Sequence, residues 1–191
     1  MGSMYGTLKT EYIRRFGTSK WEEHNRIIED FWQGIRHKVF NLNLDYQNTR
    51  LYQDGLPVCG KEIDLVQELV KMGSRNHQIL MKLIQLGATL EGTEDPKLLL
   101  EEYDYLKNAA ADLNKKHGKN RYQRLAKSIL QKRDVYIGQR IDKTLREGET
   151  GLLFIGITHR VNEKLPKDIE IDYLIYRLPF KEGFLPNGKE S

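Results

Sequence analysis

Ten consecutive residues reveal more about this chain than any others: Gly151-Leu152-Leu153-Phe154-Ile155-Gly156-Ile157-Thr158-His159-Arg160. The apolar run at their start has the length of a strand and follows a long helical pattern, so it predicts a buried central strand of an α/β sheet. Ligands of such sheets usually bind beyond the carboxyl ends of the strands. His159 lies at that end, where it is either a site residue or a strand cap bonded to a neighbouring carbonyl.

Strand and helix patterns alternate along the rest of the chain. Further strands are predicted over about 49–53, 87–93 and 169–176, and helices over about 20–39, 61–72, 76–86, 96–116 and 120–147. Strands separated by helices pair in parallel through right-handed crossovers. The predicted fold is therefore α/β, a single domain over residues 4–180. It has a mostly parallel sheet of about four strands, helices on both faces and an amino-terminal helix.

The length and composition indicate one folded domain. The chain has 191 residues, of which 39% are hydrophobic and 30% charged, enough for one sizeable core. No apolar run reaches the roughly 18 residues of a membrane span and no signal-peptide pattern opens the chain, so we expect no membrane partner and a cytoplasmic location. Residues 1–3 resemble a vector-encoded leader, and residues 181–191 are expected to be a loose tail.

Cysteine content and charge narrow the function classes. Cys59 is the only cysteine, which excludes an internal disulfide and a cysteine-rich zinc site. The net charge of +4 comes from 31 basic and 27 acidic residues. The basic residues concentrate over about 115–133, a run that a solvated helix face explains, so nucleic-acid binding is not the expected function.

Polar residues follow each of the first three predicted strands. Because the carboxyl ends of parallel strands meet at one sheet edge, we expect these side chains to converge. The carboxylates and the imidazole could hold a divalent metal or perform acid/base hydrolysis, and the predicted catalytic and metal-binding residues are the same three: His159, Asp54 and Glu94. The predicted ligand-binding residues beside them are Arg133, Arg140, Gln53, Asp95 and Arg160. Glu94 and Asp95 have a second interpretation, as charges that stabilise a helix N-terminus.

Two arginines share one face of the predicted helix over 120–147. Arg133 and Arg140 lie seven residues apart with Ile137 between them, so all three point in nearly the same direction. A cation on an apolar stripe needs a partner, which is either a structural carboxylate such as Glu94 or an anionic substrate group. Asp134 lies about 100° round the helix from Arg133 and need not share its site.

One segment resembles a known superfamily. The run Arg133-Asp134-Val135-Tyr136-Ile137-Gly138-Gln139-Arg140-Ile141, followed by the apolar strand and Gly156-Ile157-Thr158-His159, is similar to the carboxy-terminal pattern of the TraB/Tiki, erythromycin-esterase-like and ChaN-like proteins. The resemblance covers about 30 residues and implies an α/β fold with a polar pocket and, in some members, metal- or histidine-assisted hydrolysis. The matched positions are Arg133, Asp134 and His159. The first-strand histidine motif of those families is replaced here by Tyr52-Gln53-Asp54-Gly55.

The predicted function is hydrolysis of a small or peptide-like anionic substrate in one polar pocket. No Gly-x-Gly-x-x-Gly, Walker-type, His-Glu-x-x-His or Gly-x-Ser-x-Gly motif occurs, so the cofactor is unknown, with a divalent metal as the candidate. The alternative is a non-catalytic ligand-sensing or protein-interaction module. In that case the helical amino-terminal part, rich in Trp and Phe, would pair two copies into a homodimer.

Overall fold

The computed structural model describes residues 10–111 and 118–174. The chain falls into two compact units, one built from the residues up to Asn43 together with those from Asp172 onward, the other spanning Leu44–Ile171. The predicted leader at 1–3 and the tail at 181–191 lie outside the described residues.

The larger unit is α/β, as predicted. Its sheet holds β1 (Thr49–Gln53), β2 (Thr89–Glu91) and β3 (Thr150–Phe154) in the order β2-β1-β3, with both pairs parallel. Helices α3 (Glu62–Lys71) and α4 (Arg75–Gln85) connect β1 to β2, and α5 (Pro96–Ala111) and α6 (Gly118–Thr144) connect β2 to β3. The predicted parallel pairing of strands separated by helices is therefore confirmed.

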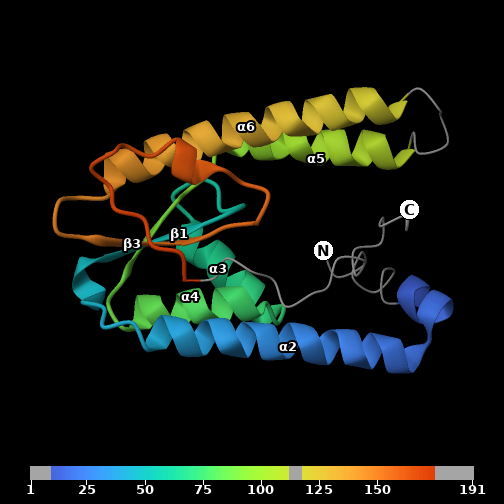
Figure 1. Cartoon of the computed structure of the whole chain (residues 1–191), viewed down its shortest axis with the longest axis horizontal. Helices are drawn as coiled ribbons and strands as arrows, with labels where there is room; N and C mark the ends of the chain where they lie inside the picture. The colour runs from blue at the N-terminus through green and yellow to red at the C-terminus, as the bar shows by residue number, and fades with distance from the viewer. Residues whose placement is uncertain (1–9, 112–117, 175–191) are drawn as a thin grey trace. The chain divides into compact units, whose positions relative to one another are not determined.

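Strand β1 lies at the centre of the sheet and is covered on both faces. Successive side chains of a strand point to opposite faces, and Leu51 and Tyr52 are both buried. Tyr52 packs in one core cluster with Ile137 and Ile141 of α6. Helices α5 and α6 lie on one face of the strands, and α3 and α4 lie on the other (Figure 1). Helices on both faces were predicted and are confirmed, and they cover Leu51 and Tyr52, which point to opposite faces of β1.

The run predicted as the buried central strand is β3, which lies at an edge of the sheet and has only exposed and half-buried residues. That part of the prediction is wrong, because an apolar run does not record how many strands pair with it.

The predicted fourth strand is wrong within the described residues. Residues 169–174 form no strand, and positions 175 and 176 lie outside the part of the chain that the structure describes. Ile169 packs against the core beside α6, whereas Ile171 and Tyr173 are 41% and 57% exposed. The alternation of apolar residues was real, but it carries no information about a hydrogen-bonding neighbour.

A close approach between α6 and the segment after β3 positions the loop that carries His159. Gly138 of α6 lies against Lys164, such that an added Cβ would lie 2.9 Å from the Lys164 Cβ and 3.0 Å from its carbonyl oxygen. The 3₁₀ turn η2 (Val161–Glu163) immediately precedes Lys164, and Val161 is buried in the core cluster with Ile137. Glycine is therefore required at 138 for the segment to pack this closely.

The smaller unit contains the predicted amino-terminal helix. It is α2 (Thr18–Phe40), preceded by a short helical segment over 10–16 that Gly17, with φ of 87°, separates from it. The Tyr12 ring packs against the rings of Phe16 and Trp21, with centroids 4.9 and 5.5 Å apart. In residues 10–111 and 118–174, no helix combines the length and the hydropathy that crossing a bilayer requires.

Candidate functional site

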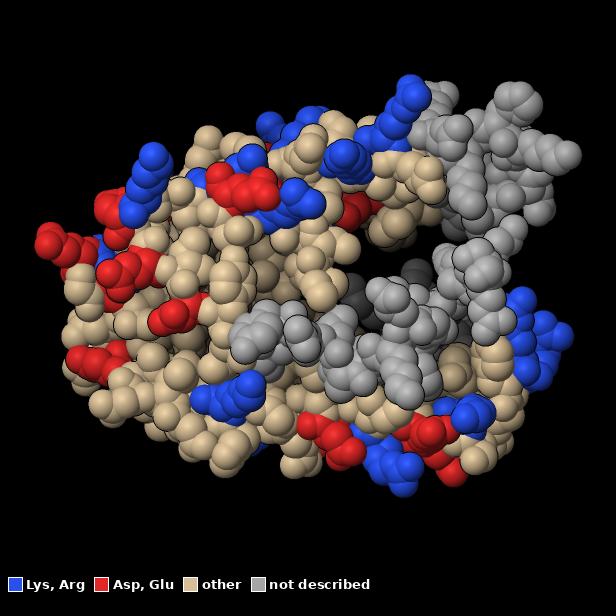
Figure 2. All heavy atoms as spheres, in the orientation of Figure 1, with Lys and Arg blue, Asp and Glu red and all other residues tan. Residues whose placement is uncertain are grey.

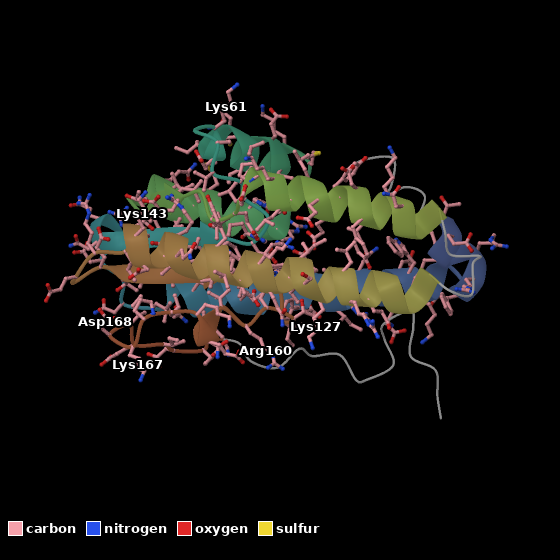
Figure 3. All side chains as sticks on the ribbon, turned by 90° about the horizontal axis from the view of Figure 1, so that it is seen from above. Lys61, Lys127, Lys143, Arg160, Lys167 and Asp168 are labelled. Atoms are coloured by element: carbon pink, nitrogen blue, oxygen red, sulfur yellow. The ribbon has the colours of Figure 1, made fainter. Side chains whose placement is uncertain are left out.

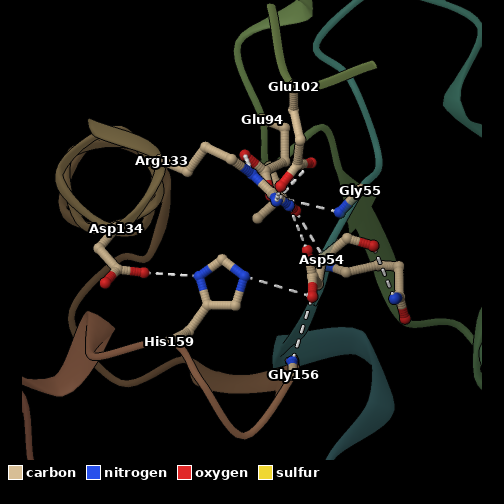
Figure 4. A network of polar contacts seen from close by, with 10 residues as sticks. Asp54, Gly55, Glu94, Glu102, Arg133, Asp134, Gly156 and His159 are labelled. Atoms are coloured by element: carbon tan, nitrogen blue, oxygen red, sulfur yellow. Dashed lines mark hydrogen bonds and ion pairs between the residues drawn. The ribbon is translucent and has the colours of Figure 1, made fainter. Parts of the chain in front are cut away.

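Three strand ends deliver polar side chains to one edge of the sheet, as the parallel topology predicted. Asp54 follows β1, Glu94 follows β2 and His159 lies in the loop after β3. These residues belong to a single network of hydrogen bonds and ion pairs with side chains of α5 and α6 (Figure 4).

Arg133 of α6 lies at the centre of this network. Its Nη2 donates to Asp54 Oδ1 at 2.5 Å and to Glu94 Oε1 at 2.6 Å, and its Nε is 3.2 Å from both Glu94 oxygens. Its Nη1 donates to both oxygens of Glu102 on α5, at 2.9 and 2.8 Å. The predicted Arg133–Glu94 pair is thus confirmed, and the guanidinium joins carboxylates from three elements of the fold.

His159 is held between two carboxylates. Its Nδ1 lies 2.6 Å from Asp134 Oδ1, and its Nε2 lies 3.5 Å from Asp54 Oδ2 (Figure 4). Asp134 also accepts from the backbone N–H of Arg160, and Asp54 accepts from the backbone N–H of Gly156. The two carboxylates therefore fix the ring and the loop that carries it. The His159 ring thus has carboxylate partners, and the backbone N–H of His159 also donates to the neighbouring Gly156 carbonyl, as the strand-cap interpretation predicted.

The charges of this network shift the pKa values of Asp54 and His159. Burial alone would raise the pKa of Asp54, but the hydrogen bond and charge of His159, together with the charge of Arg133, outweigh it and lower that pKa to about 2. Burial alone would lower the pKa of His159, but the hydrogen bonds with Asp54 and Asp134 outweigh it and raise that pKa. The network thus favours an imidazolium between two carboxylates, in which both ring nitrogens donate.

Glu94 and Arg133 form the buried part of the network. The Glu94 side chain is fully buried, and this burial raises its pKa despite the hydrogen bonds from Arg133. Burial also acts against the charge of Arg133, but the surrounding carboxylates, with Glu94 foremost, raise the pKa of that guanidinium. Arg133 therefore stays charged and orients Asp54.

The other predicted ligand-binding residues have local partners. Arg140 donates to the Gly92 carbonyl and Glu91, and Asp95 accepts from the N–H of Lys97 at the start of α5, which confirms the helix-terminus interpretation for Asp95. The Arg160 side chain is 75% exposed and pairs with Glu163, pointing outward from the ribbon (Figure 3). Only the backbone of Arg160 contributes to the network.

Gln53 is buried immediately before Asp54, with 5% of its surface exposed. Its side-chain Nε2 donates to the Asp54 carbonyl oxygen, and its backbone N–H donates to the Thr93 hydroxyl. Its side-chain Oε1 accepts no hydrogen bond within the described residues.

Two members of the network were missed among the predicted site residues, Glu102 and Asp134. Asp134 points about 100° round α6 from Arg133. Both side chains still reach the network, because the end of β1 approaches Arg133 while the His159 loop approaches the neighbouring side of the helix, where Asp134 lies. The resemblance to Arg-Asp helices was the only signal for Asp134. Glu102 had none, since a glutamate inside a helix is ordinarily solvated.

A divalent metal does not fit these residues. Asp54 and Glu94, two of the three predicted ligands, both bind the guanidinium of Arg133, so a protein cation already occupies the position between them. Among residues 10–111 and 118–174, no three or more His, Cys, Asp or Glu side chains are grouped so that they could hold a metal ion.

No protein-family model, curated protein or solved structure matches this chain. A protonated imidazole next to a partly exposed carboxylate can donate a proton to one atom while the carboxylate accepts a hydrogen bond from another.

Proposed function

We propose that this protein is a hydrolase whose reaction takes place at the Asp54–His159 pair. The observation that carries the proposal is the position of the imidazole, held by Asp134 on one side and 3.5 Å from Asp54 on the other. Acid/base catalysis often uses three groups in a line: an orienting residue, a histidine and a second polar group. The three positions matched by the superfamily resemblance, Arg133, Asp134 and His159, all belong to this network.

The proposed mechanism separates the roles of the two groups. The His159 Nε2–H donates its proton to the leaving group as the bond to that group breaks, and Asp134 stabilises the imidazolium until then. Asp54 accepts a hydrogen bond from the attacking water and takes its proton as the new bond to oxygen forms. When a substrate separates Asp54 from His159, the carboxylate loses the hydrogen bond that lowers its pKa most, so it becomes a stronger base.

The proposed substrate is a small or peptide-like molecule, and the proposed setting is the cytoplasm. Arg133 and Arg140 act in this proposal as positioning residues, since their guanidinium groups already bind carboxylates. No metal takes part in it.

One observation favours the second candidate, a non-catalytic ligand-sensing or interaction module that could pair as a homodimer. The His159 side chain is only 4% exposed, and both of its ring nitrogens have carboxylate partners. A network of that kind also fixes a loop to a helix without any chemistry.

The test is a panel of chromogenic esters, phosphates and aminoacyl anilides, assayed with and without a chelator. We expect turnover by the wild type that the chelator leaves unchanged, and a decrease of about 10²- to 10⁴-fold in kcat for His159→Ala and Asp54→Asn. His37→Ala and Asp104→Asn, at exposed positions outside the network, are the matched controls. Circular dichroism checks that every variant is folded. Turnover that survives His159→Ala would reject the Asp54–His159 pair as the place of the reaction, and no turnover on any substrate class would favour the interaction module.

A further inference from the structure

The positive charge of the chain is concentrated in one stretch of its sequence. Of the 31 basic residues, eight lie within residues 115–133, and that stretch contains no acidic residue. The other 23 stand against all 27 acidic residues, so the chain without this stretch would be acidic. A charge asymmetry of this kind favours a polyanionic partner when the basic side chains share one face of the fold.

The exposed polar residues of α6 do share a face. Arg124, Lys127, Ser128 and Gln131, which we call the donor face, are all exposed and lie three, four and seven residues apart, so they point to the same side of the helix. Each of these side chains can donate a hydrogen bond. From Gln123 to Gln139, no acidic residue is exposed, because the one carboxylate in that range, Asp134, is buried against His159.

The two cations of the donor face have no carboxylate partner among the described residues. Elsewhere on the surface, basic side chains pair with an acidic residue three positions away, as in Lys20–Glu23, Lys71–Glu68 and Arg160–Glu163. Arg124 and Lys127 are themselves three residues apart, and like charges at this spacing destabilise a helix. A bound anion would remove that repulsion.

The donor face suits phosphates better than it suits a lipid surface. A helix that lies in a membrane interface buries its apolar side in the lipid. In α6 that side is already buried within the protein, as Ile129 and Ile137 show. Its exposed large apolar residues, Leu125 and Val135, lie ten residues apart and form no continuous patch.

The donor face also suits a double helix better than a single strand. Proteins that bind single strands stack the bases on aromatic rings, and no aromatic residue is exposed from Gln123 to Gln139. The phosphates of a duplex need only donors and positive charge, which Arg, Lys, Ser and Gln side chains supply. The exposed stretch is about 24 Å long at 1.5 Å per residue, so it can lie along several phosphates.

We propose that the donor face of α6 binds the phosphate backbone of a nucleic-acid double helix without reading its sequence. The stretch 115–133 alone is equally compatible with a solvated helix, but the shared face and the unpaired cations favour an anionic partner. The proposal does not rest on the proposed hydrolase, because the donor face points away from the side of α6 that carries the buried Arg133.

The experiment measures binding of the whole protein to a labelled DNA duplex of about 20 base pairs by fluorescence anisotropy, from 50 to 200 mM NaCl. We expect a Kd of about 10⁻⁶ to 10⁻⁴ M and a logarithm of affinity that falls with the logarithm of salt concentration with a slope of about −2 to −4, as two to four phosphate contacts require. A duplex of unrelated sequence should bind equally well, and a single strand of the same length more weakly.

Two double variants with the same change in net charge locate the contact. Arg124→Gln/Lys127→Gln should reduce the magnitude of the salt slope by about 2 and weaken binding about tenfold at the lowest salt concentration. Lys61→Gln/Lys167→Gln should leave the slope unchanged. Lys61 immediately precedes α3 and Lys167 follows η2, and both are exposed and project outward (Figure 3). Circular dichroism checks that both variants are folded.

Four results would overturn the proposal: no binding to the duplex at 50 mM NaCl, binding that salt does not weaken, equal weakening by the two double variants, or tighter binding to the single strand. Vesicles of phosphatidylcholine and phosphatidylserine test the other polyanionic surface by co-sedimentation. Retention on these vesicles that Arg124→Gln/Lys127→Gln abolishes, without duplex binding, would assign the donor face to a membrane instead.

Discussion

Arg133 is the residue on which the candidate site depends most. Its guanidinium is the shared partner of Asp54 after β1, Glu94 after β2 and Glu102 of α5. Ion pairs of buried groups contribute little net stability when intact, because desolvation opposes the attraction. Removal of one partner is different, since it leaves an uncompensated charge in the interior.

We therefore expect Arg133→Met to destabilise the protein by about 3–5 kcal/mol, because it leaves the fully buried Glu94 without a cation. The double variant Arg133→Met/Glu94→Leu should recover much of that loss, since no buried charge remains at this pair. Urea unfolding at neutral pH measures both free energies.

Arg160→Met is the matched control. The Arg160 side chain is 75% exposed and its pair with Glu163 lies on the surface, so the loss should be at most about 1 kcal/mol. Equal losses for the two arginine variants would mean that the Arg133 network contributes nothing to stability.

At the scale of single residues, the sequence predicted which residues belong to the site from their positions after strands and from their spacing along helices. That reasoning found Asp54, Glu94 and His159, because strand ends meet at one edge of a parallel sheet. It could not find Glu102, whose role depends on how α5 packs beside α6. It also assigned Arg140 to the same site, although the partners of Arg140 are Glu91 and the Gly92 carbonyl.

At the scale of elements, α6 connects the core to the site. Ile137 and Ile141 pack against Tyr52 of β1, while Arg133 and Asp134 bind the polar residues beyond the strand ends. Gly138 lies one helical turn beyond Asp134, on nearly the same face, and its lack of a side chain lets the segment at Lys164 approach.

Gly138→Ala should destabilise the protein by about 1–3 kcal/mol, because the added methyl group meets Lys164 backbone and Cβ atoms that cannot easily move. This loss occurs although alanine favours a helix over glycine by up to about 1 kcal/mol. Thermal and urea unfolding measure the change, and the His159 ring signals in NMR report whether the loop has shifted.

Gly34→Ala in α2 separates the two effects, since nothing lies within 4 Å of a Cβ at that position. It should stabilise the protein by about 0.5–1 kcal/mol. If both alanine variants stabilise, α6 and Lys164 do not pack closely enough in solution to exclude a methyl group at position 138.

Helices were predicted well where a periodic pattern was long, and strands where turn residues bound them, although the apolar run of β3 did not reveal its place at the edge of the sheet. β1, β3 and the helices from α2 to α6 follow from the spacing of apolar residues and from glycines such as Gly73 and Gly148, which adopt positive φ after helices. The segment from Ile169 onward failed, because a strand also needs an available neighbour, and no pattern within a segment records one.

At the scale of the whole molecule, the exposed part of the site is acidic although the net charge of the chain is positive. The chain carries +4, and Lys, Arg, Asp and Glu are interspersed on the face seen in Figure 2, whereas the exposed part of the network consists of carboxylates. The free energy of unfolding depends on pH through the groups whose pKa values differ between the folded and unfolded states.

His159 should stabilise the whole protein at acidic and neutral pH and less in alkaline solution. Its pKa is raised above 6.5 by Asp54 and Asp134, against burial and the nearby charge of Arg133. A group whose folded-state pKa is raised contributes fully below its unfolded pKa, and this contribution is lost as pH rises through the folded-state value. The difference in unfolding free energy between wild type and His159→Asn should therefore be largest near pH 6 and shrink toward pH 9.

The contribution of Asp54 to stability changes with pH in the opposite direction and over a lower pH range. Its pKa falls from 3.8 to about 2, so its contribution is complete above pH 4 and is lost on further acidification. The alkaline decrease is therefore specific to His159, and a free-energy difference that stays constant from pH 6 to 9 would contradict an imidazolium between the two carboxylates.

The distribution of donors and acceptors around Asp54 also bears on how a catalytic cycle would end. Hydrolysis of an ester or amide creates a new carboxylate, which meets Asp54 and Glu102 on the open side and finds no unused donor in the network behind them. Like charges at short range repel, so the acidic product would leave the site readily. The carboxylates around Asp54 would in this way limit inhibition by the product.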